Sequence, residues 1–295
     1  MANMTNPEEE FRDLARFSSD IGIPKERLVD AFHIEREFHN RILKEPEPQK
    51  RATLYAEVYR RVHVLYRKSS FVSLAQNPKE RVVRMFRREL RDKSILDVGC
   101  GDGAFLFCVH RLLRHRDLVG MDISTPVIPE ETTGLRFREA NIVNFSVDRT
   151  FDVVFSDNVM EHLAPSDLSS HLRSVRKAVR DDGLFILLTP NRLFGPSDVT
   201  RILDYSYSNR IPAQGTHLNE SSYSELLPLL RRHGFRMFKT VCPLPRLKET
   251  LGLRISPSVL TFIETHRPLL SLLQMIKWRS RCVIRCDVIL ICQTA

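Results

Sequence analysis

The stretch SILDVGCGDGAFL, residues 94–106, brings an acid and three glycines together on one predicted turn. Residues 94–97 form a short predicted strand, and Ala104 begins a predicted helix. Glycines let the backbone approach a ligand closely, and the first turn of a helix offers N–H groups without intrahelical partners. A strand, a glycine-rich turn and a helix in this order therefore indicate a nucleotide-cofactor site.

A second acid, Asp122, ends the next predicted strand, where it can accept the two hydroxyls of a ribose. Two cofactor classes fit the turn. A dinucleotide such as NAD agrees with the loose pattern G-x-G-x-x-A formed by Gly99, Gly101 and Ala104. Asp97 favours the other class, S-adenosylmethionine, because a carboxylate repels a pyrophosphate and attracts an ammonium and a sulfonium.

The whole pattern Asp97-x-Gly99-x-Gly101-x-Gly103 resembles motif I of the class I S-adenosylmethionine-dependent methyltransferases. The resemblance covers residues 94–242 well, the closing strand 281–292 by pattern only, and residues 1–90 not at all. It implies S-adenosylmethionine as the cofactor, and these cofactor-binding positions: Asp97, Gly99, Cys100, Gly101, Gly103, Asp122, Ile123, Asn141, Ile142, Ser156, Asp157 and Asn158.

Some of these positions follow the family pattern less closely than others. Asn141 stands where the family more often has an aspartate facing the adenine amino group, so the acceptor oxygen is kept and the charge is lost. The stretch FDVVFSDNVMEHL, residues 151–163, is similar to the strand-four motif, which implies that residues 156–158 line the methionine end. LLTPNR, residues 187–192, is similar to the strand-five signature.

Three side chains are candidates for removing a proton from the methyl acceptor: Glu161, His162 and His217. Glu161 and His162 belong to an EHL sequence that is widespread in the family, so a structural role competes with a catalytic one. His217 lies in the connection 191–219, which is long for its place in such a fold. We predict that it acts either as a base or as a hydrogen-bonding residue of that loop.

The sequence TPNR, followed later by GTH, is similar to the motifs of two subgroups of this family. These are the ubiquinone-biosynthesis O-methyltransferases and the small-RNA 2′-O-methyltransferases. The second subgroup holds a metal with a Glu-x-x-Glu-His run and a distant histidine. Asn158 replaces the first glutamate of that run here, and hard cations prefer carboxylates. The sequence therefore predicts no metal site.

The predicted organisation is a helical extension or lid over residues 1–92 and a methyltransferase domain over residues 93–295. Amphipathic helices are expected near 24–43, 50–68 and 77–93, with a break at 45–48. From residue 94 strands and helices alternate, and one of these helices, at 164–179, is expected to be capped by Ser166 and Asp167. The fold class is α/β: the resemblance implies a Rossmann-like, seven-stranded, mostly parallel sheet with helices on both faces and an antiparallel last strand.

Two further segments have competing interpretations. Residues 243–280 form an insertion between the last two strands, and their apolar residues precede Lys277, Trp278, Arg279 and Arg281. This segment is expected to cap the substrate pocket or to lie at a membrane surface. In the loop 191–219, Tyr205, Tyr207 and the arginines at 192, 201 and 210 suit a planar or anionic substrate as well as an ordinary loop.

The charge distribution separates the predicted site from the flanks. Lys and Arg outnumber Asp and Glu by 20 to 15 in residues 1–93 and by 8 to 3 in residues 243–295, but number 17 against 18 between them. We expect a small-molecule acceptor methylated on oxygen, with RNA or tRNA methylation and a non-catalytic S-adenosylmethionine-binding module as alternatives. The acidic N-terminus and the scattered cysteines favour a cytoplasmic location.

Overall fold

The computed structural model describes residues 10–66, 79–115, 117–123, 135–243, 253–279 and 286–294. Residues 124–134, the first part of the 243–280 insertion and the expected strand residues 281–285 lie outside these ranges.

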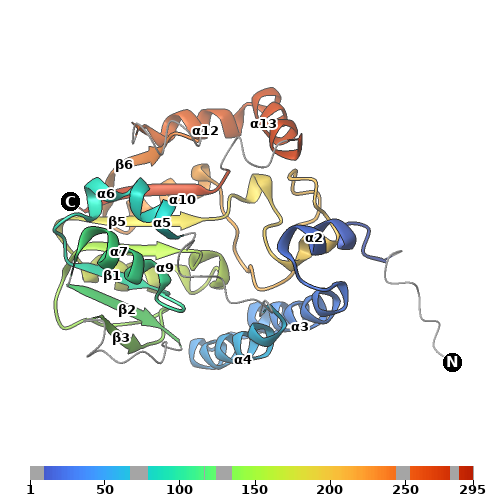
Figure 1. The fold of residues 1–295 in the computed structure, drawn as a ribbon, viewed down its shortest axis with the longest axis horizontal. Helices are drawn as coiled ribbons and strands as arrows, with labels where there is room; N and C mark the ends of the chain where they lie inside the picture. The colour runs from blue at the N-terminus through green and yellow to red at the C-terminus, as the bar shows by residue number, and fades with distance from the viewer. Residues whose placement is uncertain are drawn as a thin grey trace.

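One eight-stranded sheet forms the centre of the structure, in the order β3-β2-β1-β4-β5-β8-β6-β7 (Figure 1). β1 to β5 pair in parallel, and β8 is antiparallel to both β5 and β6. The predicted Rossmann-like fold class is therefore confirmed, and the two-residue edge strand β7 is an addition to the seven expected strands. The strands are β1 Ile95–Val98, β2 Leu118–Asp122, β3 Arg136–Glu139, β4 Phe151–Asp157, β5 Val179–Thr189, β6 Phe235–Val241, β7 Arg254–Ile255 and β8 Val288–Thr294.

Helices cover both faces of this sheet, because its central strands are apolar on both sides. Leu96 of β1 and Leu187 of β5 lie in one core cluster with α9 (Leu168–Ala178) and α10 (Tyr223–Arg232). Their neighbours Ile95 and Ile186 lie in the other cluster, with α5 (Lys79–Met85), α6 (Arg87–Leu90) and α7 (Ala104–Leu113). Side chains therefore alternate between the two helical layers along each strand.

The N-terminal helices α2 (Leu14–Ile21), α3 (Lys25–Lys44) and α4 (Pro48–Tyr66) lie beyond the carboxyl ends of the parallel strands (Figure 1). Phe38 and Ile42 of α3 and Val58 of α4 belong to the same core cluster as the sheet. α2 packs with the short helix η4 (Val199–Ile202), and Tyr205 and Tyr207 are buried in that contact. These two tyrosines therefore serve the packing of the loop on α2.

A buried ion pair joins these helices to the rest of the molecule. Arg51 of α4 donates from both Nε and Nη2 to the carboxylate of Asp167, and the Tyr55 hydroxyl donates to the same carboxylate at 2.8 Å. Arg51 and Asp167 are both less than 5% exposed. The predicted cap of the helix after β4 is therefore wrong: Asp167 stands at the N-cap of α9, but its side chain is engaged by α4 and makes no cap bond.

A helical hairpin, α12 (Pro257–Thr265) and α13 (Arg267–Arg279), lies outside the β6 side of the sheet (Figure 1). α12 contacts α10 and β6. Two further short helices, η2 (Met160–His162) and η3 (Arg192–Phe194), follow β4 and β5. None of the helices in the described part of the chain is long and apolar enough to cross a membrane.

Replacing Arg51 should destabilise the fold strongly. Arg51→Ala leaves the Asp167 carboxylate buried without its cation, at a cost of about 3–5 kcal/mol in the free energy of unfolding. Arg61→Ala on the same helix is the matched control, because its pair with Glu57 is half exposed and contributes less than about 1 kcal/mol. Urea denaturation of both variants measures the difference, and equal losses would contradict the anchoring role of Arg51.

Candidate functional site

The glycine turn lies between β1 and α7, at the carboxyl end of the sheet. Gly99 and Gly103 have φ values of 79° and 74°, a region that residues with a Cβ rarely adopt. A Cβ on Gly99 would lie 2.3 Å from Val159 Cγ2, and one on Gly103 would lie 2.7 Å from the ring of Phe137. Both positions therefore require glycine for the backbone angle and for the space.

Most N–H groups of this turn are already used within the protein. Those of Gly99 and Cys100 donate to the carbonyl of Met121, at 2.7 and 3.0 Å. The N–H groups of Gly101, Gly103 and Ala104 donate to Asp122, to the Cys100 carbonyl and to Asp102. An anion such as a pyrophosphate would have to compete for these donors. This arrangement favours S-adenosylmethionine over a dinucleotide, as Asp97 does.

Carboxyl groups crowd the same edge of the sheet. Asp97 is 3% exposed, and burial, together with the charges of Asp157, Asp122 and Asp102, raises its pKa well above its ordinary value. Lys79, the first residue of α5, opposes this shift and donates to Asp157 at 2.8 Å. Lys79 is not predictable from the sequence, because nothing in a basic amphipathic helix distinguishes one lysine that turns toward the sheet.

The other predicted cofactor residues flank this acidic edge. Asn141 is exposed, and its Oδ1 accepts from the Val143 N–H at 3.0 Å. Ser156 is buried, and its Oγ has no partner among the described residues. Asn158 is exposed with φ 59°, and its N–H continues the pairing with β5 through the Leu188 carbonyl. Three further positions are partly or fully buried: Cys100 in the turn, Ile123 directly after β2 and Ile142 shortly after β3.

The three predicted acid–base residues meet beyond the end of β4. Glu161, His162 and His217 each contribute one side-chain nitrogen or oxygen atom to a cluster, and these three atoms lie within 4.8 Å of one another. Glu161 is fully buried; its Oε2 accepts from the Thr189 hydroxyl at 3.0 Å, while its Oε1 has no partner among the described residues. The rings of His162 and His217 pack edge to face with centroids 4.7 Å apart.

The pKa values of these two histidines are shifted in opposite directions. Burial and the neighbouring charge of His217 lower the pKa of His162 to about 3, and its Nδ1 lies 3.1 Å from the Thr216 carbonyl. Burial also disfavours the charged form of His217, but the hydrogen bond to Glu220 and the charges of Asp198 and Glu161 raise its pKa to about 9. At neutral pH His162 is therefore a neutral imidazole and His217 an imidazolium. Because a carbonyl only accepts, the Nδ1 of His162 carries the proton and its Nε2 keeps a lone pair.

Two carboxylates and one backbone carbonyl hold the loop that carries His217. Glu35 of α3 accepts from the Thr216 N–H at 2.8 Å, and Asp198 accepts from the Gly215 N–H at 2.7 Å. The backbone carbonyl of Glu161 accepts from two further N–H groups of the loop, those of Leu218 and Asn219. Burial and the charge of Asp198 raise the pKa of Glu35 to about 7. Sequence spacing could not identify Glu35, which lies on a long helix far from the loop in the chain.

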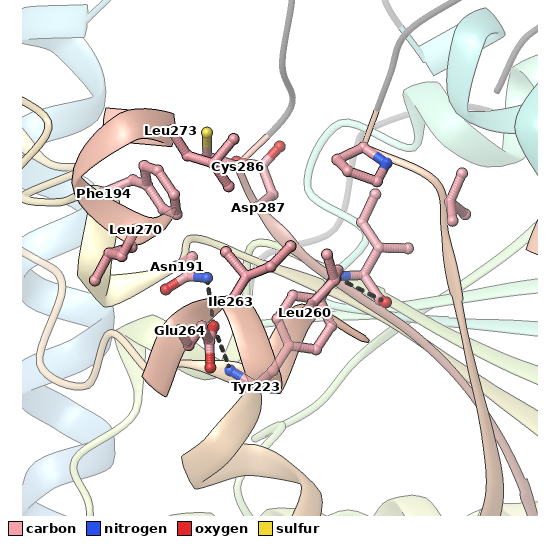
Figure 2. Close-up of a pocket in the computed structure, with 13 residues that line it drawn as sticks. Asn191, Phe194, Tyr223, Leu260, Ile263, Glu264, Leu270, Leu273, Cys286 and Asp287 are labelled. Carbon is pink, nitrogen blue, oxygen red and sulfur yellow. Dashed lines mark hydrogen bonds between the residues drawn. The ribbon is translucent and has the colours of Figure 1, made fainter. Parts of the chain in front are cut away.

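Two cavities adjoin this region. The smaller, about 220 Å³, lies between α3, α4 and the loop, and its walls include Phe38, Tyr59 and His162. The larger, about 490 Å³, lies at the end of β5 beneath the α12–α13 hairpin (Figure 2). Its walls are apolar apart from a few groups near its rim; they include Asn191, Phe194, Tyr223, Leu260, Ile263, Glu264, Leu270, Leu273, Cys286 and Asp287.

The fold and the site together define an enzyme that uses a nucleotide-type cofactor at the carboxyl end of a parallel sheet. A methyltransferase domain model matches residues 71–240, more than half of the chain. The chain belongs to this methyltransferase family and is an S-adenosylmethionine-dependent methyltransferase.

Solved structures agree with this fold. The chain is similar to a 1,6-didemethyltoxoflavin-N1-methyltransferase from Burkholderia thailandensis, with 15% identity over 85% of this chain and 92% of that one and a TM-score of 0.50. It also resembles an O-methyltransferase of a polyketide synthase multienzyme from Brevibacillus brevis, with 14% identity over 73% and 72% of the two chains and a TM-score of 0.44. Among curated protein sequences, none matches the chain.

The turn fits the cofactor on structural grounds. The glycines leave room where side chains would fill the turn, and the acidic edge is complementary to a ligand with an ammonium and a sulfonium. Ser156 Oγ offers a buried hydrogen-bonding atom at the same edge.

Adding one methyl group at Gly99 should damage cofactor binding. Gly99→Ala must shift either the turn or Val159, so we expect the affinity for S-adenosylmethionine to fall at least about tenfold. Gly22→Ala is the control, because Gly22 also has a positive φ but lies at the end of α2 with nothing within 4 Å of an added Cβ. Calorimetric titration compares the two, and wild-type affinity in Gly99→Ala would contradict the assignment of the turn.

Proposed function

We propose that this methyltransferase transfers its methyl group to an oxygen of a small molecule, with His162 as the base. The observation that carries the proposal is the placement of the His162 ring. It lines the cavity between α3, α4 and the loop, and its Nδ1 lies 3.1 Å from the Thr216 carbonyl, which leaves Nε2 as the atom that can accept a proton. Burial and the charge of His217 lower its pKa, which favours the neutral imidazole. An amine is nucleophilic when it is neutral, but a hydroxyl gains most from a base that accepts its proton during attack.

The three acid–base residues then have separate roles. His162 accepts the proton of the acceptor hydroxyl at Nε2, and the Thr216 carbonyl holds its Nδ1–H and fixes the ring. His217 is already protonated at neutral pH, so it is a poor base and acts as a fixed positive charge. The Glu161 carboxylate lies beside both rings, 4.0 Å from His162 Nε2, and stabilises the positive charge that develops on His162.

S-adenosylmethionine, when bound, supplies a methyl group activated on a sulfonium sulfur. Asp97 would hold the methionine ammonium, and Asp122 would accept from the ribose hydroxyls. Asn141 and Ile142 would face the adenine, with Gly99, Cys100, Gly101, Gly103 and Ile123 forming the turn around the ligand. Ser156, Asp157 and Asn158 would line the methionine end, beside Lys79, whose ammonium suits the methionine carboxylate.

The N-terminal helices would act as a lid on the acceptor. α3 and α4 form walls of the cavity that contains His162, and Glu35 and His39 of α3 hydrogen-bond the backbone of the loop that carries His217. A lid excludes water, which strengthens electrostatic interactions inside the site.

The decisive experiment is identification of the methylated product. Purified protein and methyl-labelled S-adenosylmethionine are incubated with a panel of phenols, catechols and hydroxy acids, with matching amines, and with tRNA. Mass spectrometry and NMR then locate the methyl group. Methylation on oxygen in a small molecule supports the proposal, methylation of an amine refutes the acceptor atom, and methylation of tRNA alone refutes the substrate class.

Cofactor affinity should depend on pH through Asp97. Its pKa is raised in the free protein, and a cationic ligand favours the ionised carboxylate. Below that raised pKa, binding must release a proton, so the affinity for S-adenosylmethionine should fall up to about tenfold for each pH unit. Titrations across a pH series measure this slope. Asp97→Asn should bind weakly with no such slope, and a persistent slope would assign it to another group.

Removing the imidazole of His162 should lower turnover while leaving cofactor binding unchanged. His162→Gln should reduce kcat about 10²- to 10⁴-fold, the usual contribution of a general base. His233→Gln is the control, because His233 also hydrogen-bonds a backbone carbonyl but lies at the end of α10. Turnover of the wild type is also measured with EDTA, because ligand atoms of Glu161, His162 and His217 lie within 4.8 Å of one another, and loss of turnover on chelation would assign these residues to a metal ion instead of acid–base chemistry. An equal kcat in His162→Gln would show that no base acts there.

A further inference from the structure

Large apolar side chains gather on the outside of the α12–α13 hairpin. Among the described residues, ten large hydrophobic side chains are exposed, and seven of them lie between positions 253 and 278. Four of them stand at every third position of α13. Residues at this spacing are neighbours on a helix surface, so they form a continuous ridge. The four, each between 40% and 50% exposed, are Leu269, Leu272, Met275 and Trp278. Val259 and Phe262 extend the apolar surface onto α12.

The core of this protein does not account for that surface. α13 has 13 residues and none of them is buried. Its inner side chains, Leu270 and Leu273, line the cavity at the end of β5, as Figure 2 shows. Its outer face carries the ridge. A contiguous apolar patch of this kind is characteristic of a surface that another phase or molecule covers.

The charges of the hairpin indicate what covers it. Arg267 opens α13, and Lys277 and Arg279 close it, next to Trp278. Glu264 is the only acid between residues 253 and 279, and its carboxylate turns inward to the N–H groups of Tyr223 and Ser224. The outer face therefore combines apolar side chains with cations alone. Aromatic and basic residues at the border of an apolar face suit the interface of a lipid bilayer.

We propose that the α12–α13 hairpin docks this protein on an anionic lipid bilayer. The apolar ridge inserts among the acyl chains at the interface, and the exposed Arg267 and Arg279 pair with anionic headgroups. A second copy of this chain is a poorer occupant, because two such faces would bring like charges together. The hairpin is too short to span the bilayer, so the attachment is peripheral and sensitive to salt.

Vesicle co-sedimentation of the full chain tests the proposal. We expect binding to phosphatidylcholine vesicles that contain phosphatidylglycerol, and much weaker binding to phosphatidylcholine alone or at high salt. Arg267→Gln and Arg279→Gln should each lower the partition coefficient about fivefold. Leu272→Gln combined with Trp278→Gln should lower it about tenfold or more. Met237→Gln is the control, because Met237 is 65% exposed but lies on β6, outside the hairpin.

Each outcome decides the proposal. All variants alter exposed side chains, and unchanged calorimetric binding of S-adenosylmethionine shows that each remains folded. Loss of vesicle binding in the hairpin variants alone supports the proposal. Equal binding of the wild type and the hairpin variants, or no binding to the anionic vesicles, overturns it. Self-association without lipid that disappears in the Leu272→Gln, Trp278→Gln variant assigns the surface to a second copy and also overturns it.

Discussion

The crowding of carboxyl groups at one edge of the sheet is the constraint on which the site depends. A parallel sheet brings the ends of β1, β2 and β4 together, and each of these ends carries an aspartate. Asp97 is buried there and its pKa is raised. Asp122 and Asp102 hold N–H groups of the glycine turn, so the donors that would bind an anion elsewhere serve the protein itself. Such an edge favours a cationic ligand, which explains why the same turn geometry serves a sulfonium cofactor here.

A second group of carboxylates organises the acid–base residues. Glu35, Asp198 and Glu220 surround the loop that carries His217 and stabilise its positive charge, and burial together with that charge lowers the pKa of His162. The division of roles between two adjacent histidines thus arises from their surroundings rather than from their positions in the chain. Because Glu35 lies on α3, the N-terminal helices are part of this electrostatic arrangement as well as a cover.

The sequence predicted the features that depend on local patterns. β4 spans residues 151–157, within the stretch 151–163 that resembles the strand-four motif, and the glycine turn follows from residue types at fixed spacing. It failed where tertiary contacts decide. Asp167 stands where a helix cap is expected from the sequence, but its carboxylate accepts hydrogen bonds from Arg51, which is distant in the chain. Lys79 and Glu35 were missed for the same reason, and Tyr205 was as compatible with a substrate loop as with its packing on α2.

The Glu264 carboxylate of α12 is one of the groups that connect the α12–α13 hairpin to the segment after β5 and to α10; Gln274 of α13, which donates to the Leu193 carbonyl at 2.7 Å, is another. Glu264 of α12 accepts from Asn191 Nδ2 at 2.9 Å, and it also accepts from the first N–H groups of α10, where it acts as a cap supplied from outside the helix. Asn191 follows β5, and its backbone bridges to Ser221 at the end of the loop that carries His217. A displacement of the hairpin must therefore strain these hydrogen bonds as well as the packing of Leu260 against the core. The hairpin is thus coupled by these contacts to the start of α10 and to the end of β5.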